Sequence, residues 1–154
     1  LAQPTTNVGI ELLGLVRQAP LAITGSYTYV RARERVDGLS QDVELTPRHS
    51  IGLVTMVENE DGRVGLEMYY TGRQRLEDNP YRDTSAPYVI VGVLVERRVG
   101  AFRLFVNGEN LANIRQSRWD PLLRPDRAAD GRWTVDSWAP VDGRIINGGI
   151  RVQF

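Results

Sequence analysis

The sequence predicts an all-β protein whose antiparallel strands run up and down across a membrane as part of a β-barrel. Three observations predict this fold class. Apolar and polar residues alternate along most of the chain, no useful stretch has the 3.6-residue period of a helix, and short links alternate with long ones. Roughly half of the residues fall in predicted strands, against the 20–25% of an ordinary domain. The length of 154 residues fits one domain.

The last stretch of the chain, residues 144–154, is a clear example of the alternation. Phe154, Val152 and Ile150 fall on one face, and Gln153 and Arg151 fall on the other. Successive side chains of a strand point to opposite sides of a sheet. A tilted transmembrane strand needs about 9–11 residues, so this stretch suits a membrane barrel. A strand of a soluble sandwich could alternate in the same way, so the links are needed to decide.

Seven strands are predicted in all. They cover about 7–16, 21–33, 49–58, 63–73, 88–96, 101–110 and 144–154. The fourth strand alternates most regularly, with Leu66 and Met68 on one face and Arg63 and Glu67 on the other. The fifth strand is apolar on both faces, so its orientation cannot be assigned from its own residues.

The links between these strands are in turn short, medium, short, medium, short and very long. Outer-membrane barrels have short turns at the periplasmic rim and longer loops outside the cell. The last link has about thirty residues and contains all three tryptophans. If the carboxyl terminus is periplasmic, we expect the first, third and fifth links to be periplasmic and the others to be extracellular.

Aromatic residues fall near both predicted rims. Those near the outer rim are Tyr27, Tyr29, Tyr69, Tyr70 and Tyr88, and those near the inner rim are Phe102 and Phe154. Membrane barrels place aromatic girdles at both interfaces. Taken together, these positions favour a membrane protein over an ordinary soluble core.

The composition excludes several classes of function. Acidic and basic residues balance at 19 each, with every basic residue an arginine, so no overall field points to nucleic acid. The absence of Cys excludes disulfides, thiol catalysis and Cys-based metal sites. No apolar run approaches the 18 residues of a transmembrane helix. The sequence begins with Leu1 rather than Met, so we expect either a removed leader or the tail of a longer polypeptide.

Seven strands present a difficulty for a complete barrel. Bacterial barrels have an even number of strands and at least eight. An open sheet would leave two unpaired edges in the bilayer, where backbone groups must be satisfied. We therefore expect the carboxyl-terminal segment of a larger barrel. One missed strand would instead give an eight-stranded barrel, and that alternative stays open.

Several short motifs, in their order and spacing, resemble the end of a TonB-dependent outer-membrane receptor. They lie at residues 9–11 (Gly-Ile-Glu), 46–49 (Thr-Pro-Arg-His), 107–113 (Asn-Gly-Glu-Asn-Leu-Ala-Asn) and 138–144 (Trp-Ala-Pro-Val-Asp-Gly-Arg), the last followed by the final strand. The resemblance implies a barrel of about 22 strands plugged by an amino-terminal domain. Residues 1–154 would be its carboxyl-terminal part, without the plug domain and the TonB box.

The same resemblance implies a function, a location and partners. The whole receptor would sit in the bacterial outer membrane, in contact with its lipid. It would import a scarce nutrient such as a ferric siderophore, cobalamin, haem or a saccharide, driven by the TonB–ExbB–ExbD complex through the missing amino-terminal regions. Phe154 would be the carboxyl-terminal signal for the barrel-assembly machinery. The alternatives are a small structural or adhesive outer-membrane barrel and a soluble β-sandwich binding module.

Two groups of residues are candidates for the site. Charged residues on the polar face would line the barrel lumen: Glu11, Arg63, Glu67, Arg73, Arg103, Glu109 and Arg151. They would contact a small-molecule ligand, or only satisfy one another or the plug. Trp119 and Trp133 of the last link would contact a ligand outside the barrel, or pack that link onto the rim.

No candidate for catalysis or metal binding emerges from the sequence. His49 is the only histidine, and nothing in the sequence marks the adjacent Ser50 as a catalytic nucleophile. Asp126, Asp130 and Asp136 lack the ligand spacing of a calcium-binding loop. We therefore expect neither an enzyme nor a bound cofactor.

Overall fold

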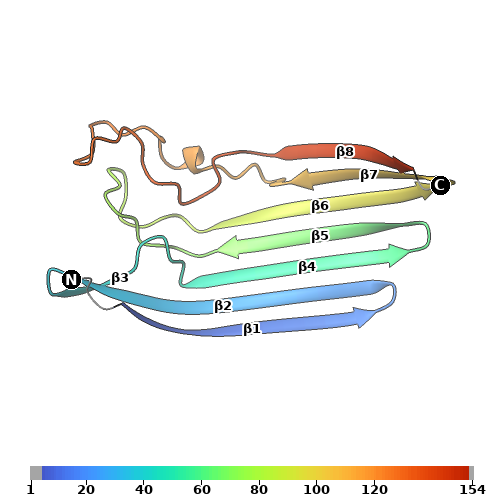
Figure 1. Ribbon diagram of the computed structural model, residues 1–154, viewed down its shortest axis with the longest axis horizontal. Coiled ribbons are helices and arrows are strands. Elements are labelled where there is room, and N and C mark those ends of the chain that lie inside the picture. Colours follow the sequence, from blue (N-terminus) through green and yellow to red (C-terminus); the bar gives the residue numbers. More distant parts are fainter. Residues whose placement is uncertain (1–4, 153–154) are drawn as a thin grey trace.

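The computed structural model describes residues 5–152, which form one antiparallel sheet of eight strands (Figure 1). The strands are β1 (Thr6–Gln18), β2 (Leu21–Val36), β3 (Leu39–Asp42), β4 (His49–Asn59), β5 (Gly62–Thr71), β6 (Tyr88–Val99), β7 (Phe102–Glu109) and β8 (Ile145–Val152). Their order in the sheet is β1-β2-β4-β5-β6-β7-β8, and β3 pairs with β2 outside this path. The all-β, up-and-down prediction is confirmed.

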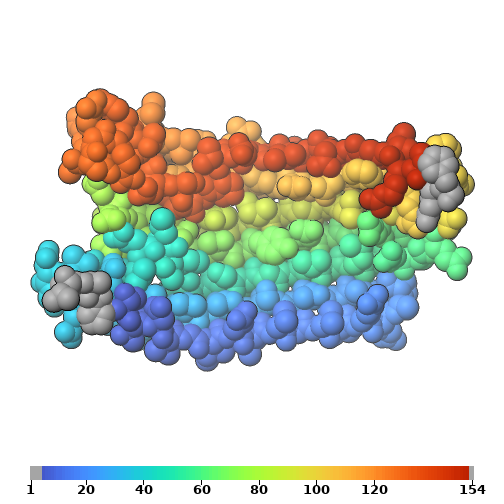
Figure 2. All heavy atoms as spheres, viewed as in Figure 1, coloured from blue at the N-terminus to red at the C-terminus, as the bar shows by residue number. Residues whose placement is uncertain are grey.

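Short and long links lie at opposite ends of the sheet. Tight turns join β1 to β2, β4 to β5 and β6 to β7 at one end, which we call the turn end (Figure 1). The links 37–48, 72–87 and 110–144 gather at the other end, which we call the link end (Figures 1 and 2). The last of these contains η1 (Gln116–Arg118), a single turn of 3-10 helix. The predicted alternation of short and long links is confirmed.

The strand β3 was not predicted from the sequence. Asp37 and Gly38 have φ angles of 52° and 81°, and a turn with two left-handed residues matches the twist of a hairpin. The turn pairs Val36 with Leu39, so this hairpin extends the sheet beyond the start of β4. Four residues are too few to show a period of two, which is why the segment was expected to be a link.

The strand register places the apolar positions of neighbouring strands side by side. Leu66 of β5, for example, pairs with Thr55 of β4 and with Val93 of β6. The residues that share this side, which we call the apolar face, include Val8, Ile10, Leu12, Ile23, Leu53, Val57, Val64, Leu66, Met68, Val91, Val93, Val95, Leu104, Val106, Ile150 and Val152. The predicted alternation is therefore continuous from β1 to β8.

The same register orients β6, which its own residues left undecided. Because Val93 pairs with Leu66, the odd-numbered residues of β6 lie on the apolar face. Its even-numbered residues, among them Glu96, lie on the opposite side, which we call the polar face. The predicted outer aromatics divide in the same way, since Tyr70 pairs with Ile51 on the apolar face whereas Tyr69 lies on the polar face.

The apolar face is open to its surroundings. Val106 is 57% exposed and Ile150 is 67% exposed. Within residues 5–152 only one buried hydrophobic residue, Ala32, belongs to a strand, and no second sheet covers this face. A contiguous apolar surface that extends from β1 to β8 marks an interaction with another apolar phase or partner.

The sheet is open at β1 and β8, which pair with each other nowhere in the part of the chain that the structure describes. The extra strand β3 lies beside β2 and does not bridge these edges. It therefore does not provide the eighth strand of a small closed barrel. Among the described residues, no helix has the length and apolar character needed to cross a membrane.

Candidate functional site

A buried carboxylate, Glu96, joins two of the predicted lumen-lining residues on the polar face. Arg63 donates from Nη2 to Glu96 Oε2 at 3.2 Å, and Arg103 donates from Nη1 to Oε1 at 2.8 Å. Glu96 is only 5% exposed, and a buried charge needs such partners. The structure thus brings Arg63 and Arg103 together through a residue that was not predicted from the sequence.

The register explains this cluster. Glu96 of β6 lies directly opposite Arg63 of β5. It also lies opposite Phe105 of β7, so Arg103 is its diagonal neighbour, within reach of a long side chain. In the sequence, Glu96 follows Leu94 by two positions near the end of a strand, so the two residues share a face. Because β6 is apolar on both faces, the sequence did not show that this face is the polar one.

Arg151 extends the cluster to β8. Arg103 pairs with Arg98 on one side and with Arg151 on the other, so three guanidinium-bearing residues lie in register across β6, β7 and β8. Like charges in directly opposed positions destabilise a sheet. A cavity of about 320 Å³ lies here, lined by Arg63, Leu94, Glu96, Phe105, Asn107, Asn147 and Arg151. The turn end of the polar face is therefore rich in positive charge.

Two of the predicted carboxylates lie together nearer the link end. Glu67 and Glu109 line one cavity of about 230 Å³. Asn107 donates from Nδ2 to Glu109 Oε1 at 2.9 Å. Glu11 lies apart from both groups, on the edge strand β1 opposite Thr28. The polar face thus has a basic part and an acidic part along the same strands.

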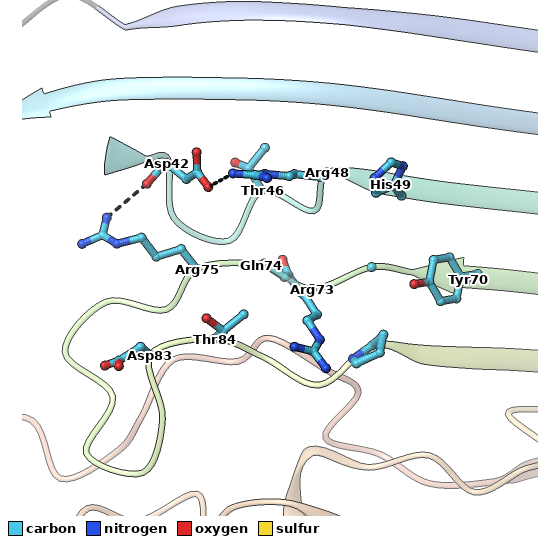
Figure 3. A pocket seen from close by; sticks show the side chains of 12 residues that line it. Asp42, Thr46, Arg48, His49, Tyr70, Arg73, Gln74, Arg75, Asp83 and Thr84 are labelled. Carbon is cyan, nitrogen blue, oxygen red and sulfur yellow. Dashed lines mark hydrogen bonds and ion pairs between the residues drawn. The ribbon is translucent and has the colours of Figure 1, made fainter. Parts of the chain in front are cut away.

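Arg73, the one remaining predicted lumen-lining residue, lies beyond the end of β5. Gly72 precedes it and donates its N–H to the carbonyl of His49 at 2.8 Å. A Cβ at Gly72 would lie 2.8 Å from that same oxygen, so a glycine is needed for this close approach. Arg73 lines a cavity of about 560 Å³ with His49 and Tyr70 (Figure 3), and none of the other six residues lines that cavity.

Links 72–87 and 110–144 pack against each other at the link end. Gln74 donates from Nε2 to the carbonyl of Trp138 at 2.9 Å, and Arg82 donates from Nε to Asp120 Oδ1 at 3.0 Å. Leu76 and Trp138 are buried in a small hydrophobic core between the two links. We call this two-link assembly the loop layer.

Gln116 is the polar residue around which the longer link is organised. Its Nε2 donates to the carbonyl of Asp136 at 2.9 Å, and its Oε1 accepts from the backbone N–H groups of Trp138 at 2.9 Å and Ala139 at 3.3 Å. Its side chain has no exposed surface. No motif marked this residue, because its partners are more than 19 positions away in the chain.

The two predicted ligand-contacting tryptophans lie in different environments. Trp119 packs on Trp138, with ring centroids 5.2 Å apart, and belongs to the hydrophobic core of the loop layer. Trp133 is 51% exposed, with the Arg127 guanidinium 5.1 Å from its ring centroid. Trp119 therefore packs within the loop layer, whereas Trp133 is accessible from outside, and ligand contact by either residue stays a prediction.

Two aspartates of the long link, Asp130 and Asp136, form ion pairs with the same arginine, Arg132. Arg132 donates its backbone N–H to Asp130 Oδ1 at 3.0 Å and from Nη1 to Asp136 Oδ1 at 2.7 Å. The hydrogen bond from that backbone N–H lowers the pKa of Asp130 below its usual value. No cluster of three metal-ligating side chains was found among the described residues.

Comparison with known proteins gives one informative match. No protein-family model and no curated protein matches the sequence. Among solved structures, the chain is similar to the ferric-catecholate import receptor Fiu from E. coli K12 in its closed form, with a TM-score of 0.62 and 17% sequence identity. The matched region covers 92% of this chain and 20% of that receptor. The fold matches part of a TonB-dependent receptor barrel.

This receptor-barrel fold agrees with the two-faced sheet and the separation of its links. The chain spans about a fifth of the receptor to which it is similar. Phe154, the predicted assembly signal, lies outside the described residues. The roles of the polar-face residues and of Trp133 stay predictions, because a likeness at 17% identity carries no residue roles.

Proposed function

We propose that the chain is the carboxyl-terminal part of an outer-membrane receptor that imports a scarce nutrient, a ferric siderophore being the leading class. The continuous apolar face across seven strands is the observation that supports this most strongly. A membrane barrel needs an outward apolar band and tolerates a polar interior. In β5, Leu66 lies on the apolar face and the next residue, Glu67, lies on the polar face, as a barrel wall between lipid and a polar interior requires.

The open edges support a larger assembly. Each edge strand presents unpaired backbone groups, which a bilayer does not tolerate. Further strands must therefore pair with β1 and β8 to complete a barrel, which would have about 22 strands in all. The plug and the segment that meets the TonB–ExbB–ExbD complex would belong to preceding regions of the same receptor.

The two ends of the sheet take different roles in this proposal. The tight turns would face the periplasm, and the loop layer would face the medium. Exposed Trp133 would meet the incoming ligand, and the arginines around Glu96 would line the lumen. The similar receptor imports ferric catecholates, which makes iron chelates the first ligands to test.

Growth under iron limitation tests this function. A strain lacking its other iron-chelate receptors would be supplied with individual ferric chelates, with and without the gene that encodes this chain. We expect the gene to support growth on at least one chelate, and loss of TonB to abolish that growth. Equal growth with and without the gene on every chelate would contradict iron import. Absence of the protein from outer-membrane fractions would contradict the receptor itself.

A further inference from the structure

The cavity of about 560 Å³ lies where the apolar face meets the links (Figure 3). His49 and Tyr70 line it, and both belong to the apolar face, since His49 pairs with Tyr29 and Tyr70 pairs with Ile51. The Tyr27 hydroxyl lies 2.9 Å from His49 Nδ1. Aromatic side chains with a polar tip are typical of the membrane–water interface. In the membrane orientation proposed above, the cavity would open at the level of the lipid headgroups.

Three arginines line this cavity, and two of them are already paired. Arg48 donates from Nη2 to Asp42 Oδ2 at 2.5 Å, and Arg75 Nη1 lies 3.0 Å from Glu44 Oε1. Figure 3 shows both Arg48 and Arg75 joined to Asp42, whereas no interaction reaches Arg73. Arg73 is exposed, and it has no hydrogen-bond or ion-pair partner among residues 5–152. Its guanidinium is available to an anion.

The rest of the lining suits an anion with several oxygen atoms. The three arginines outnumber the two lining carboxylates, Asp42 and Asp83. Thr46 and Thr84 add hydroxyl groups. A guanidinium binds phosphate with two parallel hydrogen bonds, which makes arginine well suited to phosphate recognition. The volume exceeds that of a single phosphate, so the cavity has room for the sugar or glycerol that carries one.

We propose that this cavity binds the phosphate of a lipid headgroup in the outer leaflet; the proposal rests on the membrane-spanning function proposed above. A lipid presents a phosphate at the interface with its acyl chains beside the apolar face, and a soluble anion does not. The acyl chains would lie on the row that continues from Tyr70 to Met68 and Leu66, while Arg73 binds the phosphate. Arg73 then faces the lipid headgroups rather than the barrel lumen.

Native mass spectrometry of the full-length receptor tests this site. The receptor would be released from detergent micelles that contain either diphosphorylated lipid A or the same lipid without phosphates. We expect retention of the phosphorylated lipid and little of the dephosphorylated one. The variant R73Q should reduce retention about tenfold, because it removes a hydrogen bond to a charged group. The control R35Q removes an exposed arginine at the same end of the sheet, outside the cavity, and should retain lipid as wild type does.

Three outcomes would overturn the proposal. The first is equal retention by R73Q and R35Q, and the second is equal retention of both lipids. The third is displacement of the lipid by millimolar inorganic phosphate, which would identify a free anion as the occupant. Before each comparison, heat-modifiable migration in electrophoresis would show that the variant is a folded barrel. Failure of the wild-type protein to form a membrane barrel would contradict the proposed function, whereas loss of lipid preference in a folded barrel contradicts only this site.

Discussion

At the scale of single residues, Gln116 illustrates how one buried amide orders a long link. It connects η1 to the segment 136–139 through one donated and two accepted hydrogen bonds. Removing it would leave the partly buried Asp136 carbonyl and two buried N–H groups without partners, and each buried group left unpaired costs about 1–3 kcal/mol. The sequence does not reveal this role, because the partners are distant in the chain and glutamine has no strong structural preference of its own.

The substitution Gln116→Ala should loosen the loop layer and leave the sheet intact. All three tryptophans lie in link 110–144, so intrinsic fluorescence reports on this link within the 154 residues. We expect the emission of Trp119 and Trp138 to shift to longer wavelength, with unchanged β-sheet circular dichroism. The neighbouring substitution Ser117→Ala, at an exposed position, is the control. An unshifted spectrum in Gln116→Ala would show that the amide does not order the link.

Glu44 makes the contact between links 37–48 and 72–87 sensitive to pH. Burial and the nearby carboxyl of Glu77 raise the pKa of Glu44 to about 7, although Arg75 acts in the opposite direction. Since the pKa in the folded protein lies above the usual glutamate value of 4.5, this residue's contribution to stability is complete below pH 4.5. The contribution is lost as the pH rises through about 7.

Hydrogen exchange at the Leu45 amide, which donates to the Arg75 carbonyl at 2.9 Å, measures this effect. After correction for intrinsic rates, we expect stronger protection at about pH 5 than at about pH 8, on either side of the shifted pKa. Glu44→Gln should remove the difference, because the amide does not titrate. Equal protection at both values in the wild-type protein would contradict the raised pKa.

At the scale of strands, the sequence predicted the orientation of those elements whose two faces differ in polarity. β5 was assigned correctly because Leu66 and Glu67 alternate in the sequence itself. β6 could not be oriented, since Ile90 and Leu94 make its polar side nearly as apolar as the other. Its orientation comes from pairing with β5, which is a relation between strands and not a property of one strand. Glu96 was missed for this reason.

The two sides of β5 should respond differently to one added charge. Leu66→Arg places a guanidinium on the apolar face and should cost about 2–4 kcal/mol if that face meets lipid at mid-membrane. Glu67→Arg places it on the polar face and should cost much less. Urea unfolding of the full-length receptor in lipid vesicles measures both free energies. Equal costs would mean that the two faces do not differ in their surroundings.

At the scale of the whole molecule, the structure is one open sheet with little core. Its buried hydrophobic residues lie mostly in the loop layer, while Val64 and Val106 are more than half exposed. The architecture and the separation of the links could be predicted from sequence, because they follow from local alternation and link length. The loop layer could not, because it depends on side-chain contacts such as Gln74 with Trp138.

The central claim is that the apolar face of this sheet meets lipid and the polar face meets water. The chain contains no cysteine, so each introduced thiol is a unique probe once any cysteines elsewhere in the receptor are replaced. The most direct test substitutes cysteine at each position of β6, from Tyr88 to Val99, in the full-length receptor in membranes. Each variant is then treated with a charged, membrane-impermeant thiol reagent.

We expect reactivity to alternate with a period of two. Thiols at the positions of Val89, Val91, Val93 and Val95 should react poorly, because the thiolate forms poorly in hydrocarbon and the charged reagent partitions poorly into it. Thiols at Ile90, Gly92 and Leu94 should react faster. Uniformly fast reaction at all positions, or the opposite alternation, would contradict the account.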